Sequence, residues 1–397
     1  MAKLSGRLQQ LREMREAAEA KRVVKPGETG TASAVDETSK VERKLLQKQD
    51  APLPWPGWSA VGPYVWKRSL TLPCPLETQH VEGLLLVNSS VLPNLVFYDF
   101  ETTGLSGGAG TIIFLAGFGS IKGEHLCIEQ LLLVDYPGEP AFIRALLPYL
   151  SSEKLFVSYN GKGFDRHMLL NRLRIHGYHT VDMPRQLDLL YPTRKIWGKS
   201  LQRCNLGRIE ELVLNIHRKG DIEGAFIPEC YQEFLRTQDD GCMRSVVAHH
   251  VQDIASLAQL LFHIEKTSVN PESLADEQAR LGLGLMMLPI KEARAVSLLE
   301  AELSSGNEAA GRILVPFYKR RRQLTKLREV LARMRALRAG YFQLIETAKI
   351  LEHIDKQPKT ALRLIQPLLQ QRALLSEAHF NELQHRFRRL ERKTSAL

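Results

Sequence analysis

Three segments of the chain carry acidic residues or histidine at spacings that suit hydrolytic chemistry. The first, residues 95–105, reads LVFYDFETTGL. In a strand, Asp99 and Glu101 share a face with Leu95 and Phe97, because successive side chains alternate between faces. Carboxylates at the end of an apolar interior strand are costly unless basic groups pair with them or a metal binds them. Two acids two residues apart, about 6–7 Å along a strand, suit divalent cations. Both interpretations remain open from this segment alone.

The second segment, residues 159–173, reads YNGKGFDRHMLLNRL. Asn160 and Gly161 are typical of a turn after a strand, and Asp165 would begin a helix. An acid at this position can be a functional carboxylate. The structural alternative is a helix cap or a first-turn acid that the helix dipole favours.

The third segment, residues 246–261, reads VVAHHVQDIASLAQLL. His249 and Asp253 are four residues apart and therefore neighbours on one helical face. His250 points about 100° away around the same helix. A functional pair and an ordinary surface pair are both compatible with this spacing.

The elements that must position these residues follow an α/β pattern. Four segments favour strands by their short apolar runs between turns: residues 95–100, 111–120, 126–135 and 154–159. Five segments favour helices: residues 140–150, 165–176, 204–215, 228–236 and 243–265. Strands that precede and alternate with helices predict a mixed sheet flanked by helices.

From residue 270 onwards only helices are expected. They cover residues 293–303, 308–322, 325–337, 341–354, 359–371 and 376–390. Pro316 and Pro367 fall inside two of these spans, where a kink or an early end is expected. Successive paired helices favour helical hairpins stacked as a short solenoid. The predicted domains are a polar tail over residues 1–50, an α/β domain over 51–268 and an all-α domain over 269–397.

Charge is distributed unevenly along the 397 residues. The net charge is +10, but residues 312–397 contain 20 Lys and Arg against 7 Asp and Glu, a net charge of +13. The first 311 residues therefore carry a net charge of −3. The densest basic stretch, residues 319–338, predicts binding to nucleic-acid phosphates. An acidic protein partner, or a basic face that only meets solvent, is the alternative.

Composition excludes several classes of protein. The chain is 44% apolar and 25% charged, as in ordinary globular proteins, and its apolar runs are far shorter than the roughly 20 residues of a membrane-spanning helix. We therefore expect no membrane association. The five cysteines form no C-x-x-C pair, which argues against a zinc site or disulfide framework and favours a reducing, cytoplasmic location. They are Cys74, Cys127, Cys204, Cys230 and Cys242.

Taken together, the three segments resemble the DEDD superfamily of 3′→5′ exonucleases, which have the ribonuclease H-like fold. The match is closest to the YprB-type ribonuclease H-like proteins, and it covers residues 55–265. It is carried by GPYVWKRSLTLPCP, DFETTGLSGGAGTIIFLAGFG, YNGKGFDRHML and QLDLLYPTRKIW. The C-terminal helices also resemble the tetratricopeptide-like part of that group.

The resemblance implies a set of site residues. Two Mg²⁺ or Mn²⁺ ions would be held by the acids Asp99, Glu101, Asp165 and Asp253. His249 would take a proton from the attacking water. In histidine-type exonucleases this histidine usually precedes the last aspartate by five residues, whereas His249 precedes Asp253 by four, the spacing of the tyrosine-type branch. His250 is therefore kept as a second candidate for the general base.

The resemblance implies a metal-dependent nuclease that removes mononucleotides from the 3′ end of single-stranded DNA or RNA. A structure-selective endonuclease on the same fold is one alternative. A non-catalytic adaptor that binds nucleic acid, or a protein through its C-terminal helices, is another.

Three weaker features complete the sequence predictions. Asp188 could be an acid near the site or the cap of a turn. The glycine-rich residues 106–110 could cradle a phosphate or simply connect two strands. Lys195, Lys199 and Arg203 could guide a nucleic-acid backbone or form an ordinary basic face.

Overall fold

The structure is a computed structural model that describes residues 55–73, 84–85, 91–104, 110–218, 220–337 and 340–395, with the side chain of Leu374 excepted. The predicted N-terminal tail lies outside these residues. The described chain forms two compact units. The first contains residues 55–73, 91–104, 110–189, 205–218 and 220–262, and the second contains residues 84–85, 190–204, 263–337 and 340–395.

A seven-stranded mixed sheet forms the centre of the first unit. Its order is β1-β2-β5-β4-β3-β6-β7, with β3, β6 and β7 parallel and the other neighbouring pairs antiparallel. The strands are β1 (Trp58–Gly62), β2 (Val65–Pro73), β3 (Leu95–Thr102), β4 (Ile113–Lys122), β5 (His125–Leu133), β6 (Leu155–Ser158) and β7 (Arg185–Asp188). The sequence predicts β3 to β6 and misses β1, β2 and β7.

Strand β3 lies in the interior of the sheet, between β4 and β6. Val96, Tyr98 and Phe100 point into the hydrophobic core on one face. The opposite face, which carries Asp99, meets the long helix α8 (Gly241–Val269) where Ile254 approaches Gly117 and Gly119 of β4. The alternation predicted for this strand is therefore confirmed, and its acids face α8.

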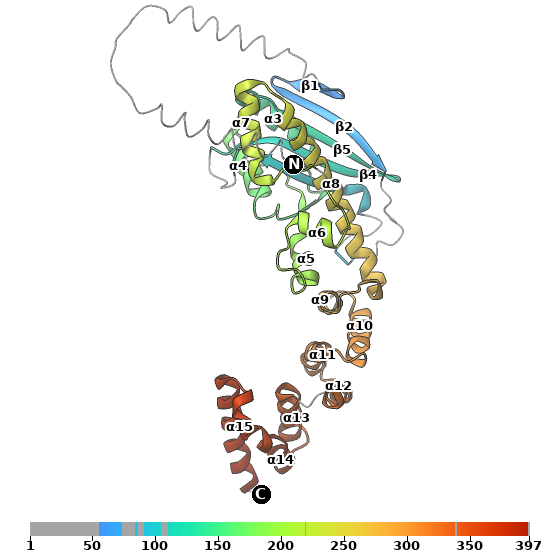
Figure 1. Cartoon of the computed structure of the whole chain (residues 1–397), viewed down its shortest axis with the longest axis vertical. Helices are drawn as coiled ribbons and strands as arrows, with labels where there is room; N and C mark the ends of the chain where they lie inside the picture. The colour runs from blue at the N-terminus through green and yellow to red at the C-terminus, as the bar shows by residue number, and fades with distance from the viewer. Residues whose placement is uncertain are drawn as a thin grey trace, which may run out of the picture. The chain divides into compact units, whose positions relative to one another are not determined.

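Four more helices belong to the first unit. They are α3 (Glu139–Leu146), α4 (Asp165–Ile175), α6 (Leu206–Leu212) and α7 (Ile227–Thr237). Residues of α3, α4 and α7 pack in the same core cluster as the apolar face of β3, and Figure 1 shows these helices beside the strands. The mixed sheet flanked by helices confirms the predicted fold class.

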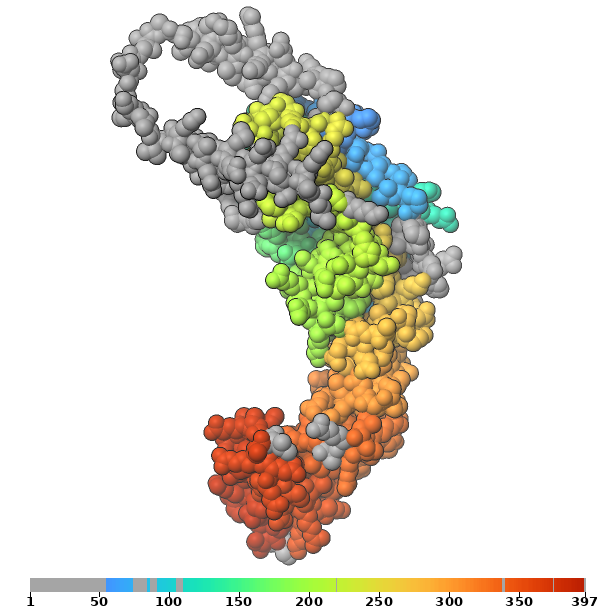
Figure 2. Space-filling model, in the orientation of Figure 1, coloured from blue at the N-terminus to red at the C-terminus, as the bar shows by residue number. Residues whose placement is uncertain are grey.

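The second unit is helical throughout its described residues. It contains α5 (Leu190–Trp197), the end of α8 and a series of helices that contact one another in chain order, as in a solenoid. The series comprises α9 (Glu277–Met287), α10 (Glu292–Ser304), α11 (Glu308–Arg320), α12 (Leu324–Leu337), α13 (Tyr341–His353), α14 (Pro358–Leu369) and α15 (Glu377–Ser395). Figure 2 shows it from orange to red. The predicted helical C-terminal region is confirmed.

Two details of the helices differ from the sequence predictions. Helix α11 continues through Pro316 to Arg320, and α14 continues two residues past Pro367. Helices α5 and α9 were not predicted. Within the described chain, none of the helices combines the length and the apolar character that a membrane crossing requires.

One disulfide corrects the prediction from cysteine usage. Cys230 of α7 and Cys242 of α8 are joined, with their Cα atoms 5.6 Å apart. They are 12 residues apart in sequence, so they form no short cysteine motif. The turn between the two helices brings them together. The argument against a disulfide framework did not anticipate this pair, and the cysteines no longer support a particular compartment.

Candidate active site

The two acids of β3 lie where the strand leaves the core. The side chain of Asp99 keeps 24% of its surface exposed. Burial raises the pKa of Asp99 well above its usual value, and the negative charges of Asp253 and Asp165 raise it further. The pKa of Glu101 is raised in the same way, by burial and then by the charges of Asp99, Asp253 and Asp165. The four carboxylates therefore lie within electrostatic reach of one another.

Asp165 reaches this group from the first turn of α4, after a tight turn that follows β6. Asn160 adopts a left-handed conformation in this turn, with φ of 66°. The Asp188 carboxylate accepts hydrogen bonds from the backbone N–H groups of Asn160 and Lys162, at 2.8 and 3.1 Å. A Cβ atom at Gly161 would lie 2.8 Å from Oδ2 of Asp165. A larger residue at position 161 would therefore clash with the Asp165 carboxylate, and glycine avoids this clash.

The same turn explains the environment of Asp165. Its side chain is buried, and the N-cap position of α4 is Phe164, which makes no side-chain capping hydrogen bond. Burial and the nearby charge of Asp188 raise its pKa to about 7. Asp188 holds the turn through backbone groups, the structural alternative noted from the sequence, and also adds negative charge beside Asp165.

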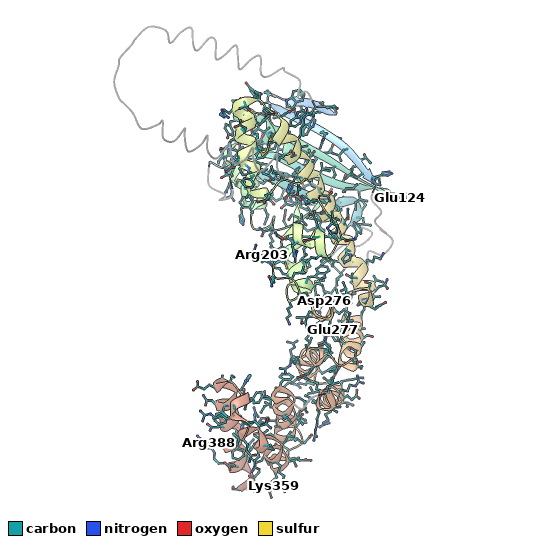
Figure 3. The ribbon with its side chains drawn as sticks, viewed as in Figure 1. Glu124, Arg203, Asp276, Glu277, Lys359 and Arg388 are labelled. Atoms are coloured by element: carbon teal, nitrogen blue, oxygen red, sulfur yellow. A yellow bond between two sulfur atoms is a disulfide. The ribbon has the colours of Figure 1, made fainter. Side chains whose placement is uncertain are left out.

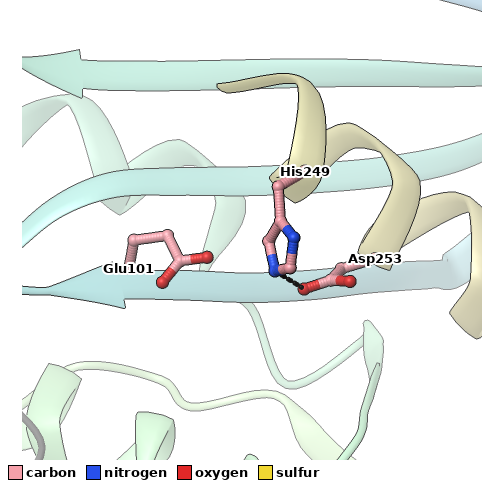
Figure 4. A group of neighbouring side chains, drawn as sticks. All are labelled: Glu101, His249 and Asp253. Atoms are coloured by element: carbon pink, nitrogen blue, oxygen red, sulfur yellow. Dashed lines mark ion pairs between the residues drawn. The ribbon is translucent and has the colours of Figure 1, made fainter. Parts of the chain in front are cut away.

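Helix α8 supplies His249 and Asp253, one turn apart. His249 Nε2 lies 3.3 Å from an Asp253 oxygen, and Figure 4 shows both side chains next to Glu101 of β3. Potential ligand atoms of Glu101, His249 and Asp253 all lie within 4.8 Å of one another. Residues about 150 positions apart in the chain thus form one compact group of donors.

His249 is held between two carboxylates. Its Nδ1 lies 2.8 Å from Asp221, and its Nε2 faces Asp253. Burial alone would lower the pKa of His249, but the hydrogen bonds and charges of Asp253 and Asp221 raise it to about 9. Conversely, His249 and Arg218 keep the pKa of Asp253 below its usual value although the carboxylate is buried.

Arg218 enters the site from the irregular segment between α6 and α7. Its guanidinium contacts the carboxylates of Glu210 and Asp253. It also lies 3.0 Å from Asp221 and from Nδ1 of His249. Sequence reasoning missed Arg218, Glu210 and Asp221, because no regular spacing connects a loop residue to the helices that it contacts.

His250 lies against the sheet and is fully buried. Its Nε2 donates to the backbone carbonyl of Asp99 at 2.9 Å, and Gln130 donates to its Nδ1 at 2.8 Å. Gln130 in turn accepts hydrogen bonds from Arg68. Burial lowers the pKa of His250 to about 4. His250 is therefore hydrogen-bonded to the sheet, whereas the ring of His249 lies between the carboxylates of Asp221 and Asp253.

The donor set fits divalent cations. The pKa values of Asp99 and Glu101 are raised by burial and by neighbouring acids, and that of Asp165 by burial and by Asp188. Cations bound among them would relieve both costs, and carboxylate oxygens are the ligands that Mg²⁺ prefers. Asp253 differs, since it is already paired with Arg218 and His249. The ribonuclease H-like fold usually uses divalent metals, in agreement with this donor set.

Two of the weaker sequence hypotheses are not tested by the structure. Residues 106–109 lie outside the described part, so the phosphate-cradle hypothesis for the glycine-rich segment is open. Lys195, Lys199 and Arg203 are exposed side chains of the second unit, and Figure 3 labels Arg203. Their contribution to substrate binding stays a prediction.

Comparison with known proteins gives two matches. A model of the RNase_H superfamily matches residues 96–264, the part that contains every acid described above. The chain is also 31% identical over 313 residues to a Bacillus subtilis (strain 168) protein described as "Uncharacterized protein YprB", and the match covers 76% of each chain. Both matches agree with the resemblance that the three motifs indicate. The superfamily supports a nuclease that hydrolyses nucleic acid.

Proposed function

Because this chain belongs to the YprB-like family of the ribonuclease H superfamily, we propose that it is a metal-dependent 3′→5′ exonuclease of the DEDD type. Its substrate is single-stranded DNA or RNA with a free 3′ end, and its products are mononucleotides. The superfamily supports a nuclease in general. We further propose the 3′→5′ direction of cleavage, the exonucleolytic mode and the two-metal mechanism.

The observation that carries the proposal is the group of four acids from three elements with one histidine beside them. Asp99 and Glu101 come from β3, Asp165 from the start of α4, and Asp253 from α8. We assign these four acids to two Mg²⁺ or Mn²⁺ ions. Such a pair of ions stabilises both the attacking and the leaving oxygen in phosphodiester hydrolysis.

His249 is our candidate for the general base. Asp221 and Asp253 fix the orientation of its ring from opposite sides, as carboxylates do for catalytic histidines. With a pKa of about 9, the ring is protonated at neutral pH, a form that cannot accept a proton. Positive charge brought next to the ring lowers its pKa, so cation binding favours the neutral form that the base needs.

Product analysis tests the mode of cleavage. We would incubate 5′-labelled single-stranded DNA and RNA, and a circular single strand of the same DNA, with the full chain and Mn²⁺. The proposal predicts a ladder of progressively shorter labelled products that ends in mononucleotide release, with the circle untouched. Cleavage of the circle would instead identify an endonuclease. Binding without cleavage of any strand would favour an adaptor.

A further inference from the structure

A cavity in the helical unit is lined by both basic and apolar side chains. It has a volume of about 600 Å³ and is lined from α11, α12, α13, α15 and the turns that follow α11 and α13. Its basic lining consists of the cations Lys319, Arg322, Lys349, Arg386 and Arg389, together with His353, whose pKa is lowered by burial. Its apolar lining consists of Leu324, Leu327, Ile350 and Ile354. No acidic residue lines it within the described chain.

The charges around the cavity are only partly balanced. Glu346 pairs with Lys319 at 2.9 Å and with Lys349 at 2.6 Å. Glu352, whose side chain is completely buried, pairs with Arg386 at 3.1 Å and with Arg389 at 2.7 Å. Lys393 also pairs with Glu352, at 2.8 Å. These two carboxylates therefore pair with five cations, and Arg322 adds a sixth positive charge near the cavity.

Two arginine side chains at the cavity have hydrogen-bond donors that no acidic group of the described residues accepts from. Arg322 is exposed and has no acidic partner among the residues that the structure describes. Arg386 is only 9% exposed, and its buried Nε has no hydrogen-bond partner within the described chain. Leaving a buried charged donor unpaired is costly, so an anion in this cavity would supply what the protein itself does not.

We propose that this cavity binds one nucleotide unit of a single-stranded nucleic acid, a proposal that rests on the proposed function. The phosphate is recognised by the surplus cations, and the base lies against the four aliphatic side chains. A volume of about 600 Å³ is within the range of small-molecule sites. Unlike a simple inorganic anion, a nucleotide uses both the charged and the apolar lining. The cavity is thus a nucleotide-binding site of the helical unit, in addition to the acids of the first unit.

Binding of a labelled single-stranded oligonucleotide to the full chain tests this proposal. We would measure fluorescence anisotropy in EDTA, where no cleavage takes place, across a series of salt concentrations. Arg322→Gln should weaken binding roughly three- to tenfold and lower the slope of log affinity against log salt by about 1. Arg335→Gln is the matched control, because Arg335 is also exposed, lies on α12 and does not line the cavity.

The apolar lining is tested separately. Ile354 is 42% exposed and lines the cavity, whereas Leu337 is 44% exposed and does not. Ile354→Ala should weaken binding of a normal strand about threefold and leave binding of an abasic strand unchanged. Leu337→Ala should change neither. These substitutions remove exposed side chains only, so the fold is retained.

Each outcome bears on the proposal independently of catalysis. Equal binding by Arg322→Gln and Arg335→Gln would overturn it. A poly-glutamate peptide provides a second test. If the peptide displaces the oligonucleotide, and if Ile354→Ala weakens binding of the peptide, the cavity binds an acidic protein partner and the proposal is overturned. If the expected losses appear but the wild type cleaves no strand with Mg²⁺ or Mn²⁺, the cavity assignment stands and the exonuclease proposal fails.

Discussion

Asp99 lies directly opposite Gly117 in the antiparallel pair of β3 and β4. A Cβ atom at position 117 would lie 2.2 Å from Cδ1 of Ile254 and 2.4 Å from Cε1 of His250. These two side chains of α8 fill the space that any other residue would need. The absence of a side chain at Gly117 therefore allows α8 to approach β3 and His250 to reach the backbone of Asp99.

Gly117→Ala should consequently destabilise the protein. The added methyl group would force α8 away from the sheet, and overpacking of this kind costs about 1–3 kcal/mol. Denaturant unfolding measures the change in free energy. Gly207→Ala is the control, since Gly207 lies in α6 with nothing within 4 Å of a new Cβ, and it should be neutral or slightly stabilising. Equal stability of the two variants would show that α8 does not depend on this close approach.

The two adjacent histidines should respond differently to substitution. His249→Gln should lower the cleavage rate by about 10²–10⁴-fold with little loss of stability, because the ring acts on a proton of the reaction. His250→Ala should lower stability by about 1–3 kcal/mol, because the Gln130 donor and the Asp99 carbonyl lose a buried partner. Cleavage rates and unfolding curves separate the two effects.

The exposed His179 provides a control for the histidine comparison. His179→Gln should retain wild-type cleavage and stability. A full cleavage rate in His249→Gln would remove this residue from the role of general base.

Arg218 should stabilise the fold and also compete with metal cations for the Asp253 carboxylate. Arg218→Gln leaves Glu210, which is 1% exposed, without its cation, and should cost about 3–5 kcal/mol of stability. It also frees the Asp253 carboxylate, so Mn²⁺ should bind more tightly to the variant. Calorimetric titration with Mn²⁺ below the unfolding temperature measures this. The exposed pair of Arg208 and Glu211 supplies the control, and Arg208→Gln should change stability by no more than about 0.5 kcal/mol.

The buried carboxylate of Glu352 should make the stability of the helical unit depend on pH. Burial opposes its ionisation, but hydrogen bonds from Arg389 and Lys393 hold its pKa at about 2, below the usual 4.5. Its ionisation therefore stabilises the fold at pH values above 4.5, and this stabilisation is lost as the pH falls from 4.5 through 2. Glu352→Gln should melt well below the wild type at pH 7, and the difference should shrink towards pH 2.

Circular dichroism melting curves at several pH values measure this dependence. Glu391→Gln, which removes an exposed acid of the same region on α15, should show no such convergence. A melting difference for Glu352→Gln that stays constant from pH 7 to pH 2 would contradict the assignment of the ion-pair network.

The sequence predicts the fold where periodicity is strong and misses it where tertiary pairing decides. Strands β3 and β4 are apolar runs that are visible in the sequence, whereas β1 and β2 contain many half-exposed positions and are strands because they pair with each other and with β5. Similarly, α11 continues through Pro316, and the residues on either side of it, Val315 and Phe317, are buried.

In the candidate site, too, some residues can be predicted from the sequence pattern and others depend on tertiary contacts. Asp99 and Glu101 stand out because acids at the end of an apolar strand are unusual, but their spacing alone fits basic partners as well as a bound cation. Arg218 could not be predicted, since its contacts with Glu210 and Asp253 depend on the path of an irregular loop. Nor does the pattern distinguish His249 from His250, because the distinction depends on which of the two rings meets the backbone of β3.

The most direct test of the account compares cation binding and strand cleavage in the wild type and in Asp99→Asn. The substitution preserves the shape of the side chain and removes one ligand charge. If the four acids hold the catalytic cations, cleavage requires Mg²⁺ or Mn²⁺ and stops with EDTA. Asp99→Asn then cleaves about 10³-fold or more slowly and binds Mn²⁺ more weakly by calorimetry. Glu124→Gln, at the exposed turn labelled in Figure 3, should behave as the wild type. Wild-type cleavage by Asp99→Asn, or cleavage that persists in EDTA, would contradict the account.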